Sequence, residues 1–511
     1  MTLKKIVLIG ASNSMLFNGL RAGLRQDGIE LTNLALGGSS ALFSLYCVLR
    51  GKYQNEIKQA DLIILESNII DVIHGTDKNN DVNLVIRNIF FAYNELSKLN
   101  KKFLVLLLPL VEKDEWLNTS ELINNAHRMC CNQYGFNCAD IQALYLKNGV
   151  MHFFMNMVPV SRHHKAHQLQ RIMCEFGKNI ANENFSLFKY SIPSSINLDF
   201  KVCSPANDLK IGGDTKEFSV SDFFHNDKCY RILKGDKYTF PICYEGYNVI
   251  AIHAWTHGKK LKTWSQHEAT NSSVIIQNEL GKFVNVTSPH YNSFLAVYDN
   301  NMLIGKHTTI SLSNLATNAV DYFDIVNIML FKDEGKMQIN INEVKETTIK
   351  REYSFSHLFP DIVFIKEVLE EYTQDVVLRL QKNEELQILS QLDFVKKFST
   401  AKQRIQEQLP YKLGQAMILS SKSFFGYLFL PCVLLSVFFL HKQKQKKTQR
   451  KEKLTLPPLE TYPDYDEALK EKECFTYKLG LALIKASKTW YMGGGIKLYF
   501  DIRKLKGKFQ K

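Results

Sequence analysis

The chain has 511 residues, of which 45% are hydrophobic and 23% charged, and its formal net charge is +13. This length is too great for one hydrophobic core, and the globular composition excludes wholesale disorder, so two or three domains are expected. Much of the positive charge lies late, in residues 441–453 and 503–508. A local basic tail favours an anionic surface near the C-terminus and argues against a nucleic-acid-binding body.

The cysteines and the N-terminus both indicate the cytoplasm. The ten cysteines are scattered without a CxxC spacing, which is typical of reduced thiols and not of a disulfide framework. The start of the chain, MTLKK, leads into only a short apolar run, so no signal peptide is expected.

Residues 1–185 alternate short apolar runs with amphipathic stretches, a pattern that predicts a parallel sheet with flanking helices. The expected strands are 6–9, 32–36, 62–65 and 103–108, and the expected helices lie near 15–26, 41–58, 83–99 and 119–134. In such α/β folds the chemistry gathers at the carboxyl ends of the strands. We therefore expect a catalytic domain over residues 1–185.

In residues 195–355 the pattern changes to short β-rich runs, which predict a β-sandwich-like domain. The expected strands are 238–242, 249–252, 273–276, 294–298 and 337–341, separated by Gly, Asn and Asp turns. Trp255 and Trp264 lie in this region, and we expect a core position for them rather than stacking on sugar rings. Residues 361–408 then predict one long helix, a spacer or an oligomerising element.

The tail, 409–511, contains an internal repeat. Residues 411–425 recur as 477–491 with eight of fifteen positions identical. An apolar run, 424–440, follows the first copy; it is interrupted by Pro431 and is shorter than the roughly 20 residues that a spanning helix needs. The basic residues that follow this run are expected on the cytoplasmic side. The N-terminal body before the run has no expected export signal, so this flank is expected on the cytoplasmic side too. The tail is thus predicted to attach peripherally to a membrane; the alternative is a buried helical hairpin packed on the body.

A serine follows the first predicted strand at the point where a helix begins. The strand ends at Gly10, and Ser12 comes two residues later. Ser12 is either an attacking hydroxyl at a strand-to-helix turn or only the N-cap of the helix. We favour the nucleophile, because capping needs neither a second glycine turn at Gly38 nor the late histidines His163 and His164.

Three segments carry a family resemblance over roughly residues 5–180: GASNS at 10–14, NLALGGSS at 33–40 and DLIILESN at 61–68. They resemble the first three blocks of the SGNH (GDSL-type) hydrolase superfamily, in which a serine attacks an acyl carbonyl. The resemblance implies that Ser12 is the nucleophile and that Gly38, with the amide of Ser12, offers oxyanion donors. It also implies an asparagine side chain as a further oxyanion donor, for which Asn68 is the candidate because it can point the same way from an extended chain, and a base at His163 or His164.

The sequence departs from the family pattern at two places. Matching through Glu66 puts Ile70 where the family asparagine falls, two residues after Asn68. Ser161 or Val160 stands where the family has an aspartate, and His164 is preferred over His163 because it lies three residues after Ser161. The histidines at 152, 163, 164 and 167 have no carboxylate or cysteine at ligand spacing, so no metal is expected.

The repeats of the tail, with residues 490–498, are similar to C-terminal segments of bacterial enzymes that build capsular and surface polysaccharides. Together the resemblances imply an O-acetyltransferase at the cytoplasmic face of the inner membrane, with acetyl-CoA as donor substrate and no tightly bound cofactor. The implied partners are a surface polysaccharide or its lipid-linked precursor, the anionic membrane surface and capsule-assembly proteins, and no nucleic acid. An SGNH carbohydrate esterase and a catalytically degenerate scaffold of the assembly machinery are the alternatives.

Overall fold

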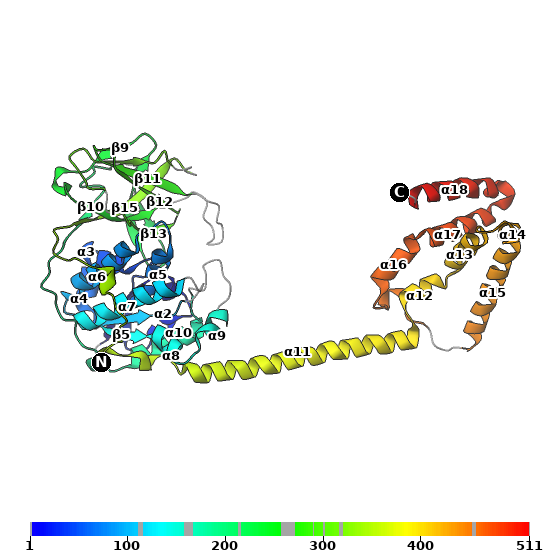
Figure 1. Ribbon diagram of the computed structural model, residues 1–511, viewed down its shortest axis with the longest axis horizontal. Helices are drawn as coiled ribbons and strands as arrows, with labels where there is room; N and C mark the ends of the chain where they lie inside the picture. The colour runs from blue at the N-terminus through cyan, green and yellow to red at the C-terminus, as the bar shows by residue number, and fades with distance from the viewer. Residues whose placement is uncertain are drawn as a thin grey trace. The chain divides into compact units, whose positions relative to one another are not determined.

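Five strands near the N-terminus form one parallel sheet in the computed structural model (Figure 1). They are β1 (Lys4–Gly10), β2 (Ile29–Asn33), β3 (Leu62–Glu66), β4 (Phe103–Leu107) and β5 (Asn137–Asp140), in the order β2-β1-β3-β4-β5. The chain reverses its direction of winding between β1 and β3, and open α/β sheets bind ligands outside the carboxyl ends of the strands at such a switch point. The predicted α/β class is confirmed.

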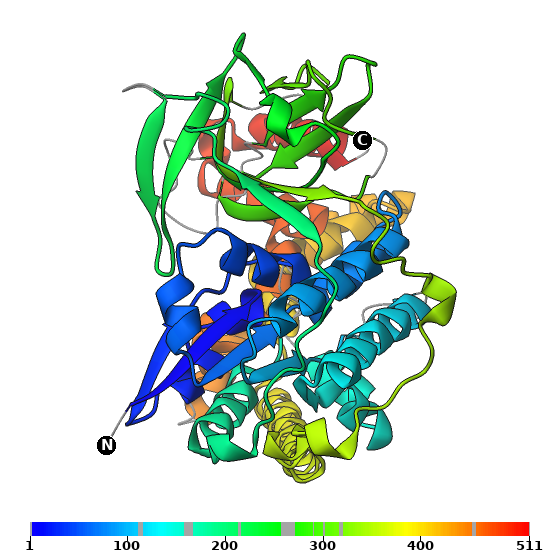
Figure 2. The ribbon, with the colours of Figure 1, turned by 90° about the vertical axis from the view of Figure 1, so that its left-hand side faces the viewer.

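Helices of this first part flank the parallel sheet (Figure 2). They are α1 (Ser12–Met15), α2 (Leu20–Leu24), α3 (Ala41–Leu49), α4 (Gln54–Gln59), α5 (Asn68–Thr76), α6 (Val82–Ser97), α7 (Leu117–Tyr134), α8 (Ile141–Lys147), α9 (Met151–Met157) and α10 (Gln170–Asn182).

The structure describes residues 3–110, 116–157, 167–212, 216–256, 271–289, 291–299, 302–315, 320–451 and 456–509. His163, His164 and Trp264 lie outside these ranges.

Central strands of the parallel sheet are buried on both faces, which is why they are continuous apolar runs in the sequence. Every residue of β3 and β4 is buried. The expected strand at 32–36 is wrong in its bounds: pairing ends at Asn33, and the following loop runs beside β1 through hydrogen bonds from Leu34 N to Leu8 O (2.8 Å) and Leu36 N to Gly10 O (2.9 Å). This loop therefore stays next to the end of β1.

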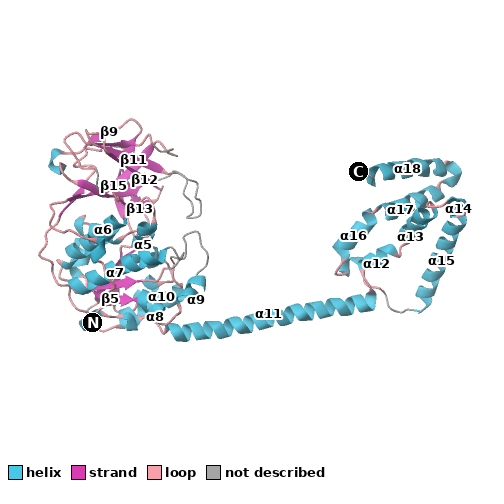
Figure 3. Ribbon diagram, viewed as in Figure 1, coloured by secondary structure: helices cyan, strands magenta, loops and turns pink. Residues whose placement is uncertain are grey.

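Two antiparallel sheets follow the α/β part (Figure 3). The six-stranded sheet has the order β13-β10-β15-β8-β7 with β6 paired to β15, and the four-stranded sheet has the order β12-β11-β14-β9. The strands are β6 (Asp199–Cys203), β7 (Glu217–Ser221), β8 (Asn226–Leu233), β9 (Lys237–Thr239), β10 (Asn248–Trp255), β11 (Ser272–Gln277), β12 (Phe283–Ser288), β13 (Asn292–Ala296), β14 (Thr309–Leu312) and β15 (Tyr322–Lys332). Apolar side chains from both sheets form one core between them.

The six-stranded sheet also packs against the α/β part. In β15, Phe323 and Ile325 belong to the sandwich core, whereas Met329 and Phe331 belong to the core of the parallel sheet. Residues 1–369 accordingly form one compact unit. The expected strand at 337–341 is wrong: Met337, Ile339 and Ile341 pack against the parallel-sheet core, but the segment is in no strand.

A buried ion pair joins the two parts of this unit. The guanidinium of Arg50, at the end of α3, pairs with the carboxylate of Asp227 in β8, and Lys52 Nζ lies 2.7 Å from the same carboxylate oxygen. Nearby, Tyr46 Oη lies 2.9 Å from His253 Nδ1 across the same boundary. The sandwich is thus fixed to the helix layer by charge as well as by apolar packing.

The second compact unit, residues 370–511, is helical. The long helix α11 (Ile362–Phe398) runs into it, followed by α12 (Ala401–Gln406), α13 (Leu409–Ser420), α14 (Phe424–Leu428), α15 (Leu430–Lys451), α16 (Tyr465–Glu473), α17 (Phe475–Lys488) and α18 (Gly494–Phe509). Within the described ranges, none of the helices combines the length and hydropathy needed to cross a bilayer.

The two copies of the repeat pack against each other through their glycines. A Cβ on Gly414 of α13 would lie 1.8 Å from the carbonyl oxygen of Thr476, and a Cβ on Gly480 of α17 would lie 1.7 Å from that of Pro410. Each glycine thus lets the backbones of α13 and α17 approach closely at equivalent positions. The repeat in the sequence is a repeat in the packing.

Candidate active site

The turn after β1 holds Ser12 at the switch point of the sheet. Ala11 is the N-cap of α1 and makes no side-chain capping hydrogen bond, and Ser12 is the half-buried first helical residue. The interpretation of Ser12 as the N-cap is therefore wrong. Gly10 precedes the turn because a Cβ there would lie 2.3 Å from Ser14 Oγ and 3.0 Å from Glu66 Oε2.

A buried carboxyl group holds this turn in place through hydrogen bonds. Glu66 ends β3 and is 1% exposed. Its Oε2 accepts hydrogen bonds from Ala11 N (3.0 Å) and Ser14 Oγ (3.0 Å). Burial raises the pKa of Glu66 to about 7, although the hydrogen bonds from Ser14 and Ala11 oppose the rise. In the sequence, the only signal for this role of Glu66 is an acid at the end of an otherwise apolar strand.

The loop after β2 is fastened beside the same turn. Asn33 Nδ2 donates to Ser14 O at 2.9 Å, so the start of the loop contacts α1. A Cβ on Gly37 would lie 3.6 Å from Met15 Sδ, and the exposed Gly38 has φ +73°, a conformation that favours glycine. The structure therefore brings the Gly37–Gly38 turn to α1, while the oxyanion role of Gly38 stays a prediction.

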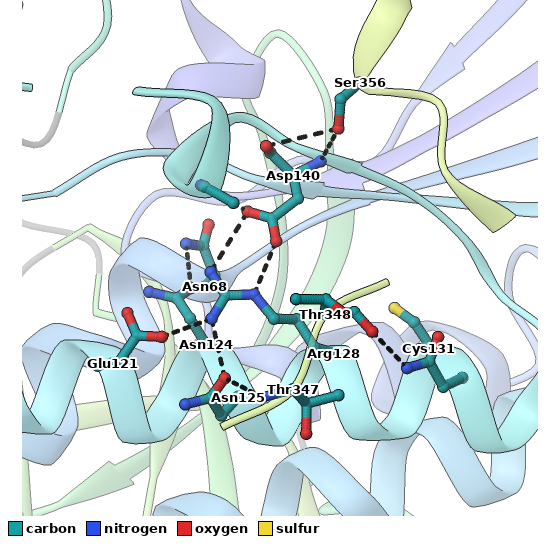
Figure 4. Close-up of polar contacts among 12 residues, drawn as sticks. Asn68, Glu121, Asn124, Asn125, Arg128, Cys131, Asp140, Thr347, Thr348 and Ser356 are labelled. Atoms are coloured by element: carbon teal, nitrogen blue, oxygen red, sulfur yellow. Dashed lines mark hydrogen bonds and ion pairs between the residues drawn. The ribbon is translucent and has the colours of Figure 1, made fainter. Parts of the chain in front are cut away.

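Asn68 is engaged within the protein (Figure 4). It begins α5, is 1% exposed, and its Nδ2 donates to Leu108 O (2.9 Å) and to Asn124 Oδ1 (2.9 Å), while its Oδ1 accepts from Leu108 N (3.0 Å). Because both amide hydrogens already have protein acceptors, this geometry contradicts the expected oxyanion role. The side chain instead ties the end of β4 to α5 and α7.

The same close-up shows what holds α7 in place beside Asn124 (Figure 4). Arg128 Nε donates to Asp140 Oδ2 (2.7 Å) at the end of β5, and Arg128 Nη1 donates to Asn125 Oδ1 (2.9 Å). Asp140 N in turn donates to Ser356 Oγ at 2.9 Å. These buried contacts form a structural network around the ends of β4 and β5.

Gln168, which follows the late histidines in the sequence, is hydrogen-bonded at the turn that holds Ser12. Gln168 N donates to Asn13 Oδ1 at 2.9 Å, and Gln168 Nε2 donates to Pro109 O at 2.8 Å. His163 and His164 lie outside the described residues, so their role as the base stays a prediction. His167, which is half-buried, directly precedes Gln168. The spacing of the histidines suggested His167 only as a metal ligand and gave no sign of its place next to this turn.

The sandwich also contributes to this edge of the sheet. His225, at the hairpin between β7 and β8, is buried, and its Nε2 lies 3.0 Å from Ala35 O in the loop that leads to Gly38.

Trp255 is 6% exposed and packs with Val220 and Cys229, as expected for a core residue. Among the residues that the structure describes, no three His, Cys, Asp or Glu side chains gather as metal ligands would.

Comparisons with known proteins add the following. A family model described as "Domain of unknown function (DUF8374)" matches residues 331–511. A search of curated proteins found no match. Among solved structures, the chain is similar to a two-domain esterase (CEX) active on acetylated mannans, at 12% identity and a TM-score of 0.39, covering 65% of this chain and 92% of that one.

Two further solved structures are similar to the N-terminal part. One is the acetyl xylan esterase AlAXEase, at 16% identity and a TM-score of 0.27, covering 35% of this chain and 96% of that one. The other is Axe2, an acetylxylan esterase from Geobacillus stearothermophilus, at 15% identity and a TM-score of 0.28, covering 36% and 96%.

Proposed function

We propose that residues 1–369 act as a serine-dependent O-acetyltransferase on a carbohydrate. The observation that supports this most is the convergence at the switch point: Ser12 follows β1, Glu66 fastens its turn, and Gln168, which follows the histidine-bearing segment, is hydrogen-bonded to the neighbouring Asn13. A serine hydroxyl becomes nucleophilic when a positioned base removes its proton. In the proposal that base is His163, His164 or His167.

The proposed reaction has two halves. Ser12 Oγ attacks the acetyl carbonyl of acetyl-CoA while a histidine takes the hydroxyl proton, and the tetrahedral oxyanion is held by backbone N–H groups of Ser12 and Gly38. Collapse expels the thiolate, which takes the proton from the histidine and leaves as the thiol. A sugar hydroxyl then attacks the acetyl-serine while the histidine takes the hydroxyl proton, and the bond to Ser12 Oγ breaks as that oxygen receives the proton from the histidine. A carbohydrate esterase would take the acetyl group from an acetylated sugar in the first half, with the sugar hydroxyl as leaving group, and would use water as the attacking group in the second.

Trapping the acetyl-enzyme tests this proposal. The full chain is incubated with acetyl-CoA or an acetylated oligosaccharide, and the peptide that contains Ser12 is examined by mass spectrometry for an acetyl adduct. We expect the adduct in the wild type and its loss in Ser12→Ala, with Ser186→Ala, an exposed serine, as the matched control. Transfer to a deacetylated oligosaccharide identifies the transferase, and release of free acetate identifies the esterase. No adduct in the wild type, or an undiminished one in Ser12→Ala, would refute the catalytic role.

We further propose that the second unit attaches the enzyme to an anionic membrane surface, where a surface polysaccharide or its lipid-linked precursor and capsule-assembly proteins would be the partners. Large apolar side chains of the tail are exposed, among them Phe424, Phe425, Leu440, Trp490, Tyr491 and Phe500. Exposed apolar groups of this extent, next to the basic residues 441–453, fit an interfacial surface.

Sedimentation with lipid vesicles tests the attachment. We expect the full chain to bind vesicles that contain anionic lipid, and Phe424→Glu with Phe425→Glu to reduce this binding. Leu280→Glu, at a residue 79% exposed in the first unit, serves as the matched control. Equal binding by all three proteins would contradict the proposed surface.

A further inference from the structure

A buried cation, Arg21, lies on the helix next to the turn that holds Ser12, and no counter-ion for it is found among the described residues. Arg21 of α2 is 5% exposed, and among the described residues its Nε has no hydrogen-bond partner. Burial and, to a smaller extent, the charge of Arg25 lower the pKa of the Arg21 guanidinium, the direction expected for a buried cation that lacks a nearby anion. Buried charges in proteins are ordinarily paired, so an arginine in this position calls for an anionic partner.

Aromatic rings from both parts of the first unit frame this guanidinium. Its central carbon lies 4.0 Å from the ring centroid of Phe17 and 5.0 Å from that of Phe224. Phe223 contacts Phe17 edge to face, with the ring centroids 5.5 Å apart, and both rings are largely exposed, at 77% and 59%. Rings that cover the faces of a guanidinium leave the N–H groups at its edge to donate hydrogen bonds.

The hairpin that supplies Phe223 and Phe224 is held in a defined conformation by hydrogen bonds. Asp222 Oδ1 accepts hydrogen bonds from Phe224 N (2.7 Å) and His225 N (2.7 Å), and Asp222 Oδ2 accepts one from Asn292 Nδ2 (3.3 Å). His225 in turn contacts the loop after β2. The aromatic rings are therefore presented by a defined turn of the sandwich and not by a free chain end.

The helix that carries Arg21 packs next to the turn that holds Ser12. A Cβ on Gly19 would lie 3.8 Å from the carbonyl oxygen of Asn13, so the chain folds back against the residue that follows Ser12. Helix α2 then packs tightly on α10, because a Cβ on Gly23 would lie 1.8 Å from Cys174 O. Helix α2, which carries Arg21, therefore lies beside α1, which begins at Ser12.

We propose that Arg21, framed by Phe17, Phe223 and Phe224, is a binding subsite for an anionic group of the substrate, a carboxylate or a phosphate, with the exposed rings contacting the attached sugar or other apolar moiety. A guanidinium matches both anions because its N–H groups bind two oxygens at once. The anion belongs either to an acidic sugar of the acceptor or to the phosphates of a nucleotide-containing acyl donor. This proposal rests on the proposed function, since it concerns the substrate of the same site.

Binding measurements on a chain that cannot turn over test the subsite. The full-length Ser12→Ala protein is titrated calorimetrically with methyl glucuronoside, methyl glucoside, coenzyme A and inorganic phosphate. We expect Arg21→Gln to lower the affinity for the anionic ligands about 10- to 100-fold, the range for hydrogen bonds to charged groups. The affinity for the neutral glucoside should stay unchanged. Arg25→Gln, at an exposed arginine four residues away, should change nothing, and Arg21→Lys should restore part of the binding.

The pattern of losses identifies the source of the anion. A loss of affinity confined to the glucuronoside assigns the subsite to an acidic acceptor sugar. A loss of affinity confined to coenzyme A and phosphate assigns it to the acyl donor. Should Arg21→Gln fail to fold, Phe223→Ala changes a residue 77% exposed and should weaken the organic anions but not inorganic phosphate.

Undiminished anion binding in Arg21→Gln, or equal losses for charged and neutral ligands, overturns the proposal. So does an equal effect of Arg25→Gln. The acetyl adduct on Ser12 is measured separately in the wild type, so failure of the subsite and failure of the proposed function are distinguishable.

Discussion

The ionisation of Glu66 should be visible in the stability of the first unit. Burial raises the pKa of this carboxyl group from its ordinary 4.5 to about 7. A difference of about 2.5 between the two pKa values corresponds to about 3 kcal/mol at 1.36 kcal/mol for each pH unit. The folded protein therefore binds this proton more tightly than the unfolded chain, and its stability should fall as the pH rises from about 4.5 to about 7 and then level off.

Replacing Glu66 by Gln removes this dependence. The amide keeps the shape of the side chain and an oxygen that accepts from Ala11 N and Ser14 Oγ. At about pH 8 the wild type has to bury a carboxylate and the variant does not, so we expect Glu66→Gln to be more stable by up to about 3 kcal/mol. At about pH 4.5 the two proteins should be nearly equal, because the wild-type group is then protonated in the folded state.

Urea unfolding of the full chain, followed by circular dichroism at several pH values, measures the effect. Glu56→Gln is the matched control, because Glu56 is an exposed acid on α4 and should show no such gain. A difference between Glu66→Gln and wild type that does not change with pH would refute the reasoning. A loss of stability in the variant at about pH 8 would show that the carboxylate stabilises the turn despite its burial.

Two further predictions concern packing. Asp227→Asn leaves Arg50 buried without its carboxylate and should lower the free energy of unfolding by about 3–5 kcal/mol, whereas Asp227→Leu with Arg50→Met should recover most of it in urea unfolding. Gly480→Ala places a Cβ 1.7 Å from Pro410 O and should increase hydrogen exchange in α13 and α17. Gly507→Ala, where an added Cβ has nothing within 4 Å, should leave exchange unchanged or slow it slightly.

The apolar strands of the parallel sheet could be predicted from the sequence because burial on both faces requires unbroken apolar runs. The strand β5 could not, because its four residues, NCAD, carry no such pattern. The alternation at Met337, Ile339 and Ile341 predicted a strand, yet those half-buried side chains pack against the parallel-sheet core without strand pairing. Alternation reports which side chains are buried, not which backbone groups pair.

For the site, the sequence could place Ser12, because an apolar run, a glycine and an amphipathic stretch specify a strand-to-helix turn. It could not place Glu66, Arg21 or the β7–β8 hairpin, since their roles depend on contacts between distant segments. The hydrogen bond between His225 and Ala35, for example, joins residues 190 positions apart. The choice of Asn68 failed for a similar reason, because Leu108 and Asn124 already engage its amide.

The mutual packing of α13 and α17 has a consequence for how the second unit assembles. Two copies of one segment that meet through equivalent atoms make an isologous interface, the kind found in symmetric dimers of separate molecules. Here both halves belong to one polypeptide, so the effective concentration of one half around the other is set by the intervening chain and not by the amount of protein. The tail can therefore complete this pairing at any dilution, without a second molecule.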